Sequence, residues 1–270
     1  MSIRLGIIGG GVMAEAIVTR LLASDIYSAE TVLVSEPQLQ RREFLAKTYQ
    51  VNVTANNQET FDASEALLLA IKPQVLDKVT VELQLENREN YPLILSILAG
   101  VKLARLEKAF INFPVIRVMP NTPAMVGAGV TAIAGGKHIK PHHLSLGSSI
   151  FAAVGEVVEV PESMMDAVTG LSGSGPAFVA MMIEGLSDGG VAAGLPRAIA
   201  SKLARQTVLG TAKLIEETGL HPAQLKDNVT SPGGTTIAGV GKLEEKGFRS
   251  AVIEAVRAAY ERSQQLGQSE

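Results

Sequence analysis

A glycine-rich turn near the start of the chain constrains the fold more than any other segment. The apolar run Leu5-Gly6-Ile7-Ile8 leads directly into Gly9-Gly10-Gly11-Val12-Met13-Ala14. This is the pattern G-x-G-x-x-A, placed after a strand-like run and at the start of a helix-like one, as dinucleotide-binding domains require. A flexible glycine-rich turn is the alternative, but it does not explain the flanking strand and helix patterns.

Each small residue of this turn has a physical role in such a domain. Gly9 would permit the tight turn, Gly11 would let the backbone approach a pyrophosphate, and Ala14 would let the helix pack closely on the strand. The first N–H groups of the helix would then face the anion. We therefore expect cofactor contacts at Gly9, Gly11, Val12, Met13 and Ala14.

The first half of the chain repeats an apolar run followed by a helix-like segment. The apolar runs are Ile3 to Ile8, Thr31 to Val34, Ala66 to Ile71, Leu93 to Leu98 and Val115 to Met119. The helix-like segments are Val12 to Leu22, Gln38 to Thr48, Val75 to Leu83 and Leu103 to Phe110. This alternation predicts a parallel sheet, and continuous hydrophobicity in its strands indicates helices on both faces. The predicted fold is a doubly wound α/β domain of the Rossmann type.

The pattern changes near Pro161. Ser163 is a candidate N-cap, with the carboxylate of Asp166 three residues later, and no convincing strand follows Met164. Helices are predicted over Pro176 to Ala193, Arg197 to Thr218 and Phe248 to Leu266. We therefore expect a dinucleotide-binding domain over residues 1–162 and an all-α domain over residues 163–270.

One segment of the second domain, Phe178 to Ile183, is apolar on every side of a helix. A domain of this size has little interior in which to bury such a helix, so we infer that a second subunit covers it. A central helix of a monomeric bundle is an equally good interpretation of the periodicity alone.

Composition excludes several classes of protein. The 24 basic and 27 acidic residues give a net charge of −3, which argues against nucleic-acid binding. The chain has 0 cysteines, so thiolate metal sites and thiol chemistry are excluded. The first apolar run is too short for a signal peptide, and the longest uncharged stretches contain Pro and Gly. We expect a soluble cytoplasmic protein without a membrane segment.

The residue that contacts the adenosine ribose is expected about 20 residues after the glycines, at the end of the second strand. Ser35 and Glu36 stand there. An acid accepts hydrogen bonds from the ribose hydroxyls of NAD, whereas Ser35 with Arg41 and Arg42 would suit the 2′-phosphate of NADP. The arginines are also compatible with a solvated helix face. NADP is the expected cofactor and NAD the alternative.

Further ligand contacts are expected after the other strands, because ligands in open α/β sheets bind beyond the carboxyl ends of the strands. The segments in question are Lys72-Pro73-Gln74, Ala99-Gly100 and Pro120-Asn121-Thr122-Pro123. Each is also compatible with an ordinary loop that ends a strand.

The helical half contains a second glycine-rich turn, Asn228-Val229-Thr230-Ser231-Pro232-Gly233-Gly234-Thr235-Thr236, before a helix-compatible segment. Successive backbone N–H groups at this helix start, with the Ser231 hydroxyl, would bind a carboxylate. An N-cap with a capping Ser or Thr is the equally good structural alternative. The clustered histidines, His138, His142 and His143, have no carboxylate among them, so we predict no metal site.

These motifs, in this order, resemble the pyrroline-5-carboxylate reductase family. The resemblance is carried by Ile8 to Ala14, Ala70 to Gln74, Arg117 to Pro123, Asp166 to Thr169, Leu171 to Pro176 and, above all, Asp227 to Thr236. It extends from the first strand almost to the C-terminus. It implies reduction of the C=N bond of Δ1-pyrroline-5-carboxylate by hydride from NAD(P)H, giving L-proline.

The resemblance also implies site residues and partners. Cofactor contacts are implied at Asn57, near the adenosine ribose, and at Ala70, Lys72, Pro73, Ala99, Gly100, Asn121 and Thr122. Ser35 and Glu36 are expected contacts from their position after the second strand, and Glu36 is the chief departure from the family's pattern. The substrate carboxylate would lie on Ser231, Gly233, Gly234 and Thr235, and the Thr236 hydroxyl would face the ring nitrogen. The substrate turn would come from the partner subunit, so a homodimer would be the minimal active unit, with a pentamer of dimers as a common larger assembly.

Two other functions are compatible with part of the sequence. A β-hydroxyacid dehydrogenase also joins a dinucleotide domain to a helical one, but it needs Lys and Asn on the helix that here reads Ala177 to Ile183. A non-catalytic nucleotide sensor would bind the cofactor without turnover, and it leaves the turn from Ser231 to Thr236 unexplained.

Overall fold

The computed structural model describes residues 3–62, 65–85 and 91–268. The chain divides into two compact units. The first comprises residues 1–173 and 259–270, and the second comprises residues 174–258. Each unit is described by itself below.

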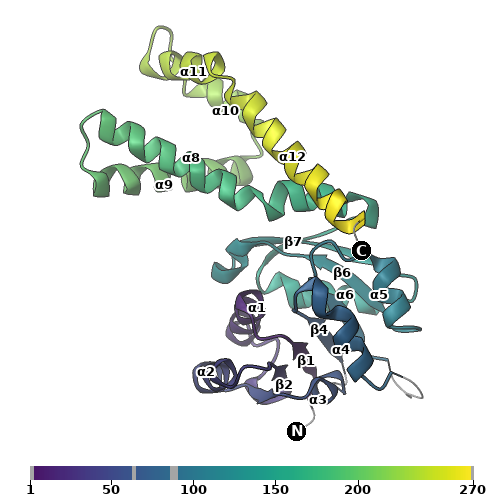
Figure 1. The fold of residues 1–270 in the computed structure, drawn as a ribbon. Coiled ribbons are helices and arrows are strands. Elements are labelled where there is room, and N and C mark those ends of the chain that lie inside the picture. Colours follow the sequence, from purple (N-terminus) through teal and green to yellow (C-terminus); the bar gives the residue numbers. More distant parts are fainter. Residues whose placement is uncertain (1–2, 63–64, 86–90, 269–270) are drawn as a thin grey trace. The chain divides into compact units, whose positions relative to one another are not determined.

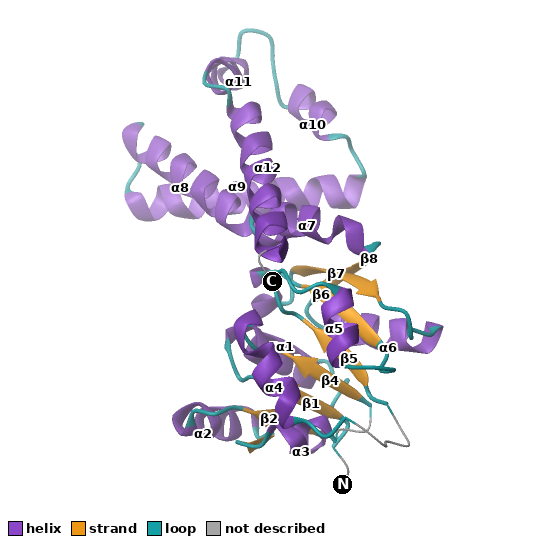
Figure 2. Cartoon of the chain, turned by 45° about the vertical axis from the view of Figure 1, so that its right-hand side comes forward, coloured by secondary structure: helices purple, strands orange, loops and turns teal. Residues whose placement is uncertain are grey.

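Within the described residues, the first unit contains one sheet of eight strands in the order β3-β2-β1-β4-β5-β6-β7-β8 (Figure 2). All neighbours are parallel except β6 and β7. The strands are β1 Leu5–Ile8, β2 Val32–Ser35, β3 Asn52–Thr54, β4 Ala66–Leu69, β5 Leu93–Ser96, β6 Val115–Met119, β7 Gly129–Gly135 and β8 Gly155–Glu159. The strand order reverses between β1 and β4, which is where such sheets bind ligands. The predicted doubly wound fold is confirmed.

Helices cover both faces of this sheet (Figure 1). They are α1 Val12–Ala23, α2 Leu39–Tyr49, α3 Asn57–Phe61, α4 Leu76–Glu82, α5 Leu103–Ala109, α6 Pro141–Ala152 and α7 Met165–Val168. Short turns of 3-10 helix are η1 Ala29–Thr31, η2 Pro73–Val75, η3 Thr122–Val126 and η4 Glu162–Met164, and η5 Thr169–Gly173 is a π-helical turn.

The hydrophobic core of the first unit is split by the sheet into two clusters. In β1, Ile7 packs in the cluster formed with α1, α2 and α6, whereas Ile8 packs in the cluster formed with α3, α4 and α5. In β4, Leu68 belongs to the first cluster and Leu67 to the second. Because alternate side chains enter opposite clusters, every position of these strands is apolar.

The five predicted strands all exist, but three strands are missing from the prediction. β7 reads GVTAIAG and β3 has only 3 residues, so neither presents the long branched apolar run on which strand assignment depended. β8 is partly exposed and carries glutamates at two of its five positions. β3 and β8 are the edge strands, where burial no longer imposes continuous hydrophobicity, whereas β7 is largely buried but consists mostly of small residues.

The predicted N-cap at Ser163 is wrong. Ser163 lies inside η4, which Pro161 precedes, and no side chain caps the following helix α7. The Asp166 carboxylate does not close a capping box and instead accepts a hydrogen bond from Ser263, 2.7 Å away. Ser163 and Asp166 have the three-residue spacing of a capping box, but in the fold the Asp166 carboxylate bonds to a side chain that is distant in the sequence.

The second unit is helical throughout its described residues, as predicted. Its helices are α8 Gly175–Ala192, α9 Arg197–Thr218, α10 Pro222–Asn228, α11 Thr235–Glu245 and α12 Phe248–Gln268, the last turns of which belong to the first unit. α8 and α9 lie side by side (Figure 1). Gly194 and Gly219, both with positive φ, end α8 and α9.

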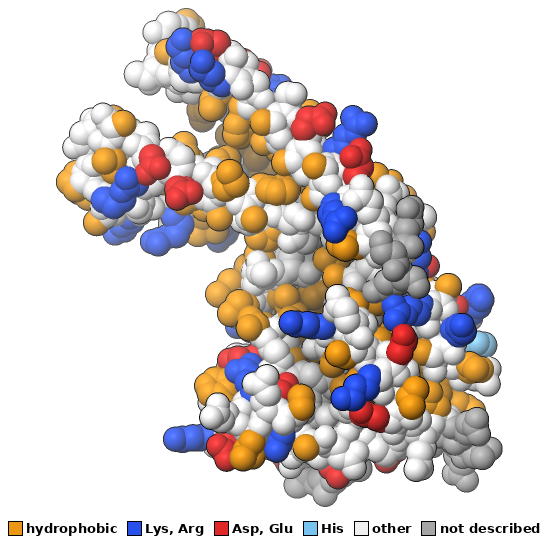
Figure 3. All heavy atoms as spheres, viewed as in Figure 1, with side chains coloured by type: hydrophobic (Ala, Val, Ile, Leu, Met, Phe, Trp, Pro, Cys, Tyr) orange, Lys and Arg blue, Asp and Glu red, His pale blue; other side chains and the backbone are white. Residues whose placement is uncertain are grey.

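The second unit buries almost none of its own side chains. Over residues 174–258 only Ser187, Ala200 and Ala204 are buried. Val179 and Met181 of α8 are 42% and 70% exposed, and apolar side chains are visible over these helices in Figure 3. The interpretation of α8 as the central helix of a monomeric bundle is therefore wrong.

Candidate functional site

The first glycine turn has the geometry that a pyrophosphate cradle needs. Gly9 has φ +103°, and a Cβ atom there would lie 2.5 Å from the Ala70 carbonyl oxygen, so any side chain is excluded. Gly11 has open space around its Cα, because a Cβ there would meet nothing within 4 Å. The same turn thus combines a tight approach to β4 with an accessible backbone.

The helix that follows this turn presents uncapped N–H groups. Gly11 is the N-cap of α1 and no side chain caps the helix, while Val12 is 66% exposed. The first N–H groups of a helix have no partner inside it, and they carry the positive end of the helix dipole. The residues Gly11, Val12 and Met13 therefore fit the pyrophosphate of a dinucleotide, and Ala14, 2% exposed, lets α1 pack on the sheet.

The Glu36 carboxylate is hydrogen-bonded to the backbone of the glycine loop. One of its oxygens accepts a hydrogen bond from the Gly10 N–H and the other from the Gln38 N–H, each over 3.0 Å. Glu36 is 8% exposed. The carboxylate thus fixes the glycine loop to the end of β2, a role that the sequence did not predict.

The two arginines near this point are also engaged. Arg41 Nε donates to the Gly10 carbonyl over 2.6 Å, and its guanidinium pairs with Glu15 on α1. Arg42 donates to the carbonyl oxygens of Glu36 and Pro37. Burial opposes ionisation of Glu15, but hydrogen bonds from Tyr49 and Arg41 outweigh it and lower the Glu15 pKa. Arg41 therefore supports the glycine loop and Arg42 supports the turn after β2, so neither side chain is part of an unconnected solvated face.

Ser35, Asn57 and Glu82 form a chain of hydrogen bonds beside Glu36. The Ser35 hydroxyl donates to Asn57 Oδ1 over 2.5 Å, and Asn57 Nδ2 donates to Glu82 Oε2 over 2.8 Å. Ser35 is 1% exposed. Ser35 therefore orients the Asn57 amide, and Asn57 is the better placed of the two to meet a ribose.

The loops after β4, β5 and β6 share one edge of the sheet, because these strands are parallel neighbours. The predicted residues Ala70, Lys72 and Pro73 follow β4, Ala99 and Gly100 follow β5, and Asn121 and Thr122 follow β6. Lys72, Ala99 and Thr122 are exposed at this edge. The fold thus brings together three segments that are distant in the sequence.

Asn121 has a structural partner at each end of its amide. Its Nδ2 donates to the Ser172 carbonyl over 3.1 Å, and its Oδ1 accepts from the Val130 N–H over 3.0 Å. Asn121 is 9% exposed. The side chain thus joins the end of β6 to β7 and to the π-helical turn η5.

The second glycine turn opens α11 without a side-chain cap. Gly233 has φ +65°, and Gly234 is the N-cap with no capping hydrogen bond. A Cβ on Gly234 would lie 2.3 Å from Ser231 Oγ, so the Ser231 side chain would have to rotate to admit one. The alternative of an N-cap with a capping Ser or Thr is wrong.

The predicted substrate residues lie at the start of α11. Thr235 and Thr236 are the first two residues of this helix, and their N–H groups belong to its uncapped first turn. Ser231, Gly233 and Thr235 are exposed and Thr236 is partly exposed. This arrangement can hold a carboxylate on backbone N–H groups with one hydroxyl beside it.

The described residues offer neither a metal site nor a membrane-spanning helix. No group of three or more His, Asp or Glu side chains there could hold a metal ion. The His142 and His143 rings lie 3.9 Å apart, and burial together with the charges of His142 and Lys140 lowers the His143 pKa. No helix in the described part of the chain combines the length and the apolarity that crossing a membrane would take.

Two family models match the chain. The model for pyrroline-5-carboxylate reductase dimerisation matches residues 162–266, and the model for NADP oxidoreductase, coenzyme F420-dependent, matches residues 4–100. The two matches cover the helical part and the glycine-loop part of the chain, respectively.

Curated proteins and solved structures resemble the whole chain. The pyrroline-5-carboxylate reductase of Synechocystis sp. is 66% identical over 267 residues, 99% of each chain, and that of Escherichia coli is 41% identical over 271 residues, 100% of each chain. The enzyme from Coxiella burnetii superimposes with a TM-score of 0.90 at 34% identity, covering 97% of this chain and 98% of its own. The Plasmodium falciparum enzyme with NADP bound gives 0.87 at 31% identity, covering 98% of each chain.

Proposed function

The chain belongs to the pyrroline-5-carboxylate reductase family, and we propose that its two glycine turns hold the two reactants of that enzyme. The reaction is the reduction of Δ1-pyrroline-5-carboxylate to L-proline, the last step of proline biosynthesis. The cofactor is NADP, which supplies the hydride in its reduced form.

The cofactor fits the first turn. Backbone N–H groups of Gly11, Val12 and Met13 would hold the pyrophosphate, and Gly9 allows the close approach to β4 on which their position depends. Asn57, oriented by Ser35, would contact the adenosine ribose. The exposed edge formed by Lys72, Pro73, Ala99, Gly100 and Thr122, with Ala70 beneath it, would hold the nicotinamide, while Asn121 fixes the last of these loops.

The substrate fits the second turn, and the observation that carries this assignment is the uncapped start of α11. The N–H groups of Gly234, Thr235 and Thr236 would bind the carboxylate, with the Ser231 hydroxyl beside them and Gly233 forming the turn. An anion at this position replaces the missing side-chain cap. The imine ring would then lie over the first turn of the helix.

Thr236 would act by hydrogen bonding rather than by titration. A Thr hydroxyl does not ionise near neutral pH, so it cannot serve as an acid of matched pKa. It can donate a hydrogen bond to the ring nitrogen while hydride from NADPH adds to the carbon of the C=N bond, and the nitrogen then takes a proton from water to become an amine. Positioning then contributes more of the rate than proton transfer does.

The nucleotide preference depends on Glu36. Its negative charge stands where the adenosine ribose is expected, but both oxygens are hydrogen-bonded to backbone N–H groups, and Arg41 and Arg42 lie beside it. We propose that NADPH is accepted because these groups offset the charge, and that NADH is accepted as well.

The active assembly would be a homodimer in which the substrate turn comes from the partner subunit. The match of the dimerisation model to the helical part of the chain supports a homo-oligomer. A pentamer of dimers, the domain division at residue 162 and a cytoplasmic location are further proposals. The pentamer of dimers is proposed from the resemblance to the family. The domain division is proposed from the start of the dimerisation match at residue 162. The cytoplasmic location is proposed from the absence of cysteine in the sequence, which suits a reducing compartment.

The test is loss of NADPH absorbance that depends on pyrroline-5-carboxylate, with NADH assayed in parallel and proline measured as product. Turnover with proline formation is the expected result. Nucleotide binding without turnover of either cofactor would contradict the proposed sites and favour a non-catalytic sensor.

A further inference from the structure

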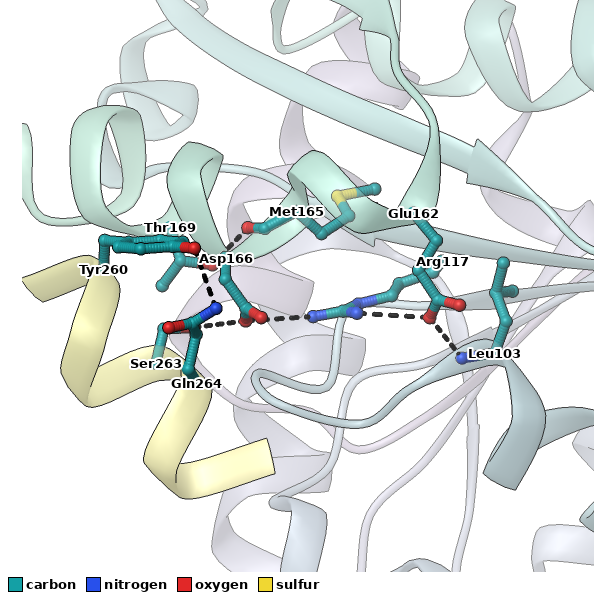
Figure 4. Close-up of polar contacts among 9 residues, drawn as sticks. All are labelled: Leu103, Arg117, Glu162, Met165, Asp166, Thr169, Tyr260, Ser263 and Gln264. Atoms are coloured by element: carbon teal, nitrogen blue, oxygen red, sulfur yellow. Dashed lines mark hydrogen bonds and ion pairs between the residues drawn. The ribbon is translucent and has the colours of Figure 1, made fainter. Parts of the chain in front are cut away.

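A polar cluster in the first unit joins three segments that are far apart in the sequence (Figure 4). Arg117 lies in β6, and its side chain is 6% exposed. Its guanidinium lies 3.2 Å from Glu162 Oε1 and 4.0 Å from Asp166 Oδ1. Ser263 on α12 donates a hydrogen bond to the same Asp166 oxygen over 2.7 Å. One carboxylate therefore links α12 to the sheet.

The two carboxylates of this cluster have different tasks. Glu162 Oε1 also accepts a hydrogen bond from the Leu103 N–H over 2.5 Å, at the start of α5. Glu162 thus connects Arg117 to the start of α5, within the first unit. Asp166 connects Arg117 instead to α12, the helix through which the chain returns from the helical unit. Loss of the Asp166 contact would therefore affect this connection specifically.

The same end of α12 packs on a predicted nicotinamide loop. A Cβ on Gly267 would lie 3.3 Å from the Gly100 carbonyl oxygen, and one on Gly100 would lie 4.0 Å from the Gly267 nitrogen. Gly100 has φ +80°. The position of α12 is thus coupled to the backbone of the loop after β5.

The segment through which the chain leaves the first unit is held by the same strand. Asn121, just after β6, donates to the Ser172 carbonyl, and a Cβ on Gly173 would lie 2.8 Å from Met119 Cε. Both connections to the helical unit are therefore attached around β6, the outgoing one at its end and the returning one at Arg117.

We propose that Arg117, Asp166 and Ser263 form a positioning element for hydride transfer. The proposal rests on the proposed function, in which the helical unit of each subunit supplies its substrate turn to the nucleotide held by the first unit of the partner subunit. Hydride transfer requires the two reacting carbons at about 3–3.5 Å, and a small displacement costs a large part of the rate. Anchoring α12 at Asp166 would limit the movement of the helical unit from its attachment point.

The test is Ser263→Ala, with Asp166→Asn as the second variant. The single-turnover rate of hydride transfer, at saturating substrate and NADPH, is expected to fall about tenfold in Ser263→Ala. The NADPH Kd should stay unchanged, because neither residue touches the glycine loop. Rates are expressed per NADPH-binding site, so that loss of folded protein does not count as loss of rate.

A matched control is Ser149→Ala, since the Ser149 hydroxyl on α6 donates only within its own helix, to the Ser145 carbonyl. Ser149→Ala should keep the wild-type rate of hydride transfer. Ser263→Thr should retain most of that rate, because it keeps the hydroxyl that Ser263→Ala removes. The double variant Ser263→Ala/Asp166→Asn should be no slower than Asp166→Asn alone.

An unchanged transfer rate in Ser263→Ala, in protein whose wild type reduces the substrate, would overturn the positioning role. A decrease in thermal stability at constant rate per site would do the same, because it would show a structural contact only. A wild type that binds NADPH and does not reduce pyrroline-5-carboxylate would instead contradict the proposed function. The two failures are therefore distinguishable.

Discussion

The two units of this chain acquire their cores in different ways. In the first unit, strands and helices bury their apolar side chains against one another in two clusters, one on each face of the sheet. In the second unit, the same chain leaves Met181, Leu203 and Ile253 more than half exposed. The second unit thus has no hydrophobic core of its own within a single chain.

This difference shows how an interface can be recognised from a single chain. Leu and Met side chains in exposed helical positions cost solvation free energy, at about 25 cal/mol per Å² of apolar surface left in water. A homo-oligomer recovers that free energy by burying the helices against a second copy. The region matched by the dimerisation model, residues 162–266, includes Met181, Leu203 and Ile253.

The largest effect is expected from a charge on the exposed face of α8, which tests whether this face is the interface between subunits. Met181→Asp, at a residue 70% exposed in the single chain, would bury an unpaired carboxylate in the dimer. We expect a monomer on light scattering and a loss of reductase activity of about 10²-fold or more, since such a charge costs about 3–5 kcal/mol. The NADPH Kd should stay near the wild-type value.

The control for this variant is Val81→Asp on α4, at a residue 86% exposed in the first unit. It should leave both assembly and activity unchanged. If Met181→Asp remained an active dimer, the exposed face of α8 would not be the interface, and the comparison between the units would need another explanation.

The second largest effect is expected at the start of α11. Thr236→Ala removes the hydroxyl that would donate to the ring nitrogen, and kcat/KM should fall about 10²-fold, as for loss of one donor at a reacting centre. Thr218→Ala is the control and should be neutral for catalysis, because it removes a hydroxyl that donates to the Leu214 carbonyl and accepts from the Leu220 N–H at the end of α9. Wild-type kcat/KM in Thr236→Ala would show that the backbone N–H groups alone orient the substrate.

The contrast between the units also explains which features the sequence could predict. In the first unit, burial on both faces makes β1, β4 and β5 continuously apolar, so these strands were found from hydrophobicity alone. β3, β7 and β8 were missed because position in the sheet, rather than composition, makes them strands. The helices of the second unit were found because Gly and Pro mark their ends.

The site was predictable where backbone chemistry dictates the residue type. Gly9 is required because a Cβ there would lie 2.5 Å from the Ala70 carbonyl oxygen, and the absence of a Cβ on Gly234 leaves room for the Ser231 hydroxyl. The sequence shows both glycines directly. Glu36, Asn121 and Asp166 each have a hydrogen-bond partner that is distant in the sequence, 26, 51 and 97 residues away, respectively. Local patterns cannot reveal such pairs, so the capping role predicted around Asp166 was wrong.

Within the first unit, two neighbouring glycines should respond differently to the same change. Gly9→Ala places a Cβ against the Ala70 carbonyl at φ +103°, and should lower the free energy of unfolding by about 2 kcal/mol or more. In Gly11→Ala the added Cβ has no atom within 4 Å, so the free energy of unfolding should be unchanged. The NADPH Kd should rise about tenfold, because the Cβ would occupy the space in which the pyrophosphate approaches the backbone. Urea unfolding and fluorescence titration measure the two effects. Equal loss of stability in both variants would contradict the open cradle at Gly11.

The smallest expected effect concerns the choice between NADPH and NADH. Glu36→Gln replaces a carboxylate that accepts from Gly10 and Gln38 with an amide that can accept from only one of them. It also removes a negative charge near the expected 2′-phosphate, an interaction of about 1–2 kcal/mol at intermediate dielectric. The kcat/KM ratio of NADPH to NADH should therefore rise about fivefold, while kcat/KM for NADH falls because the glycine loop loses a contact. Glu59→Gln, at an exposed residue outside this contact network, should leave the ratio unchanged. An unchanged ratio in Glu36→Gln would mean that the two N–H groups and the arginines already cancel the charge, leaving Glu36 as a brace for the loop.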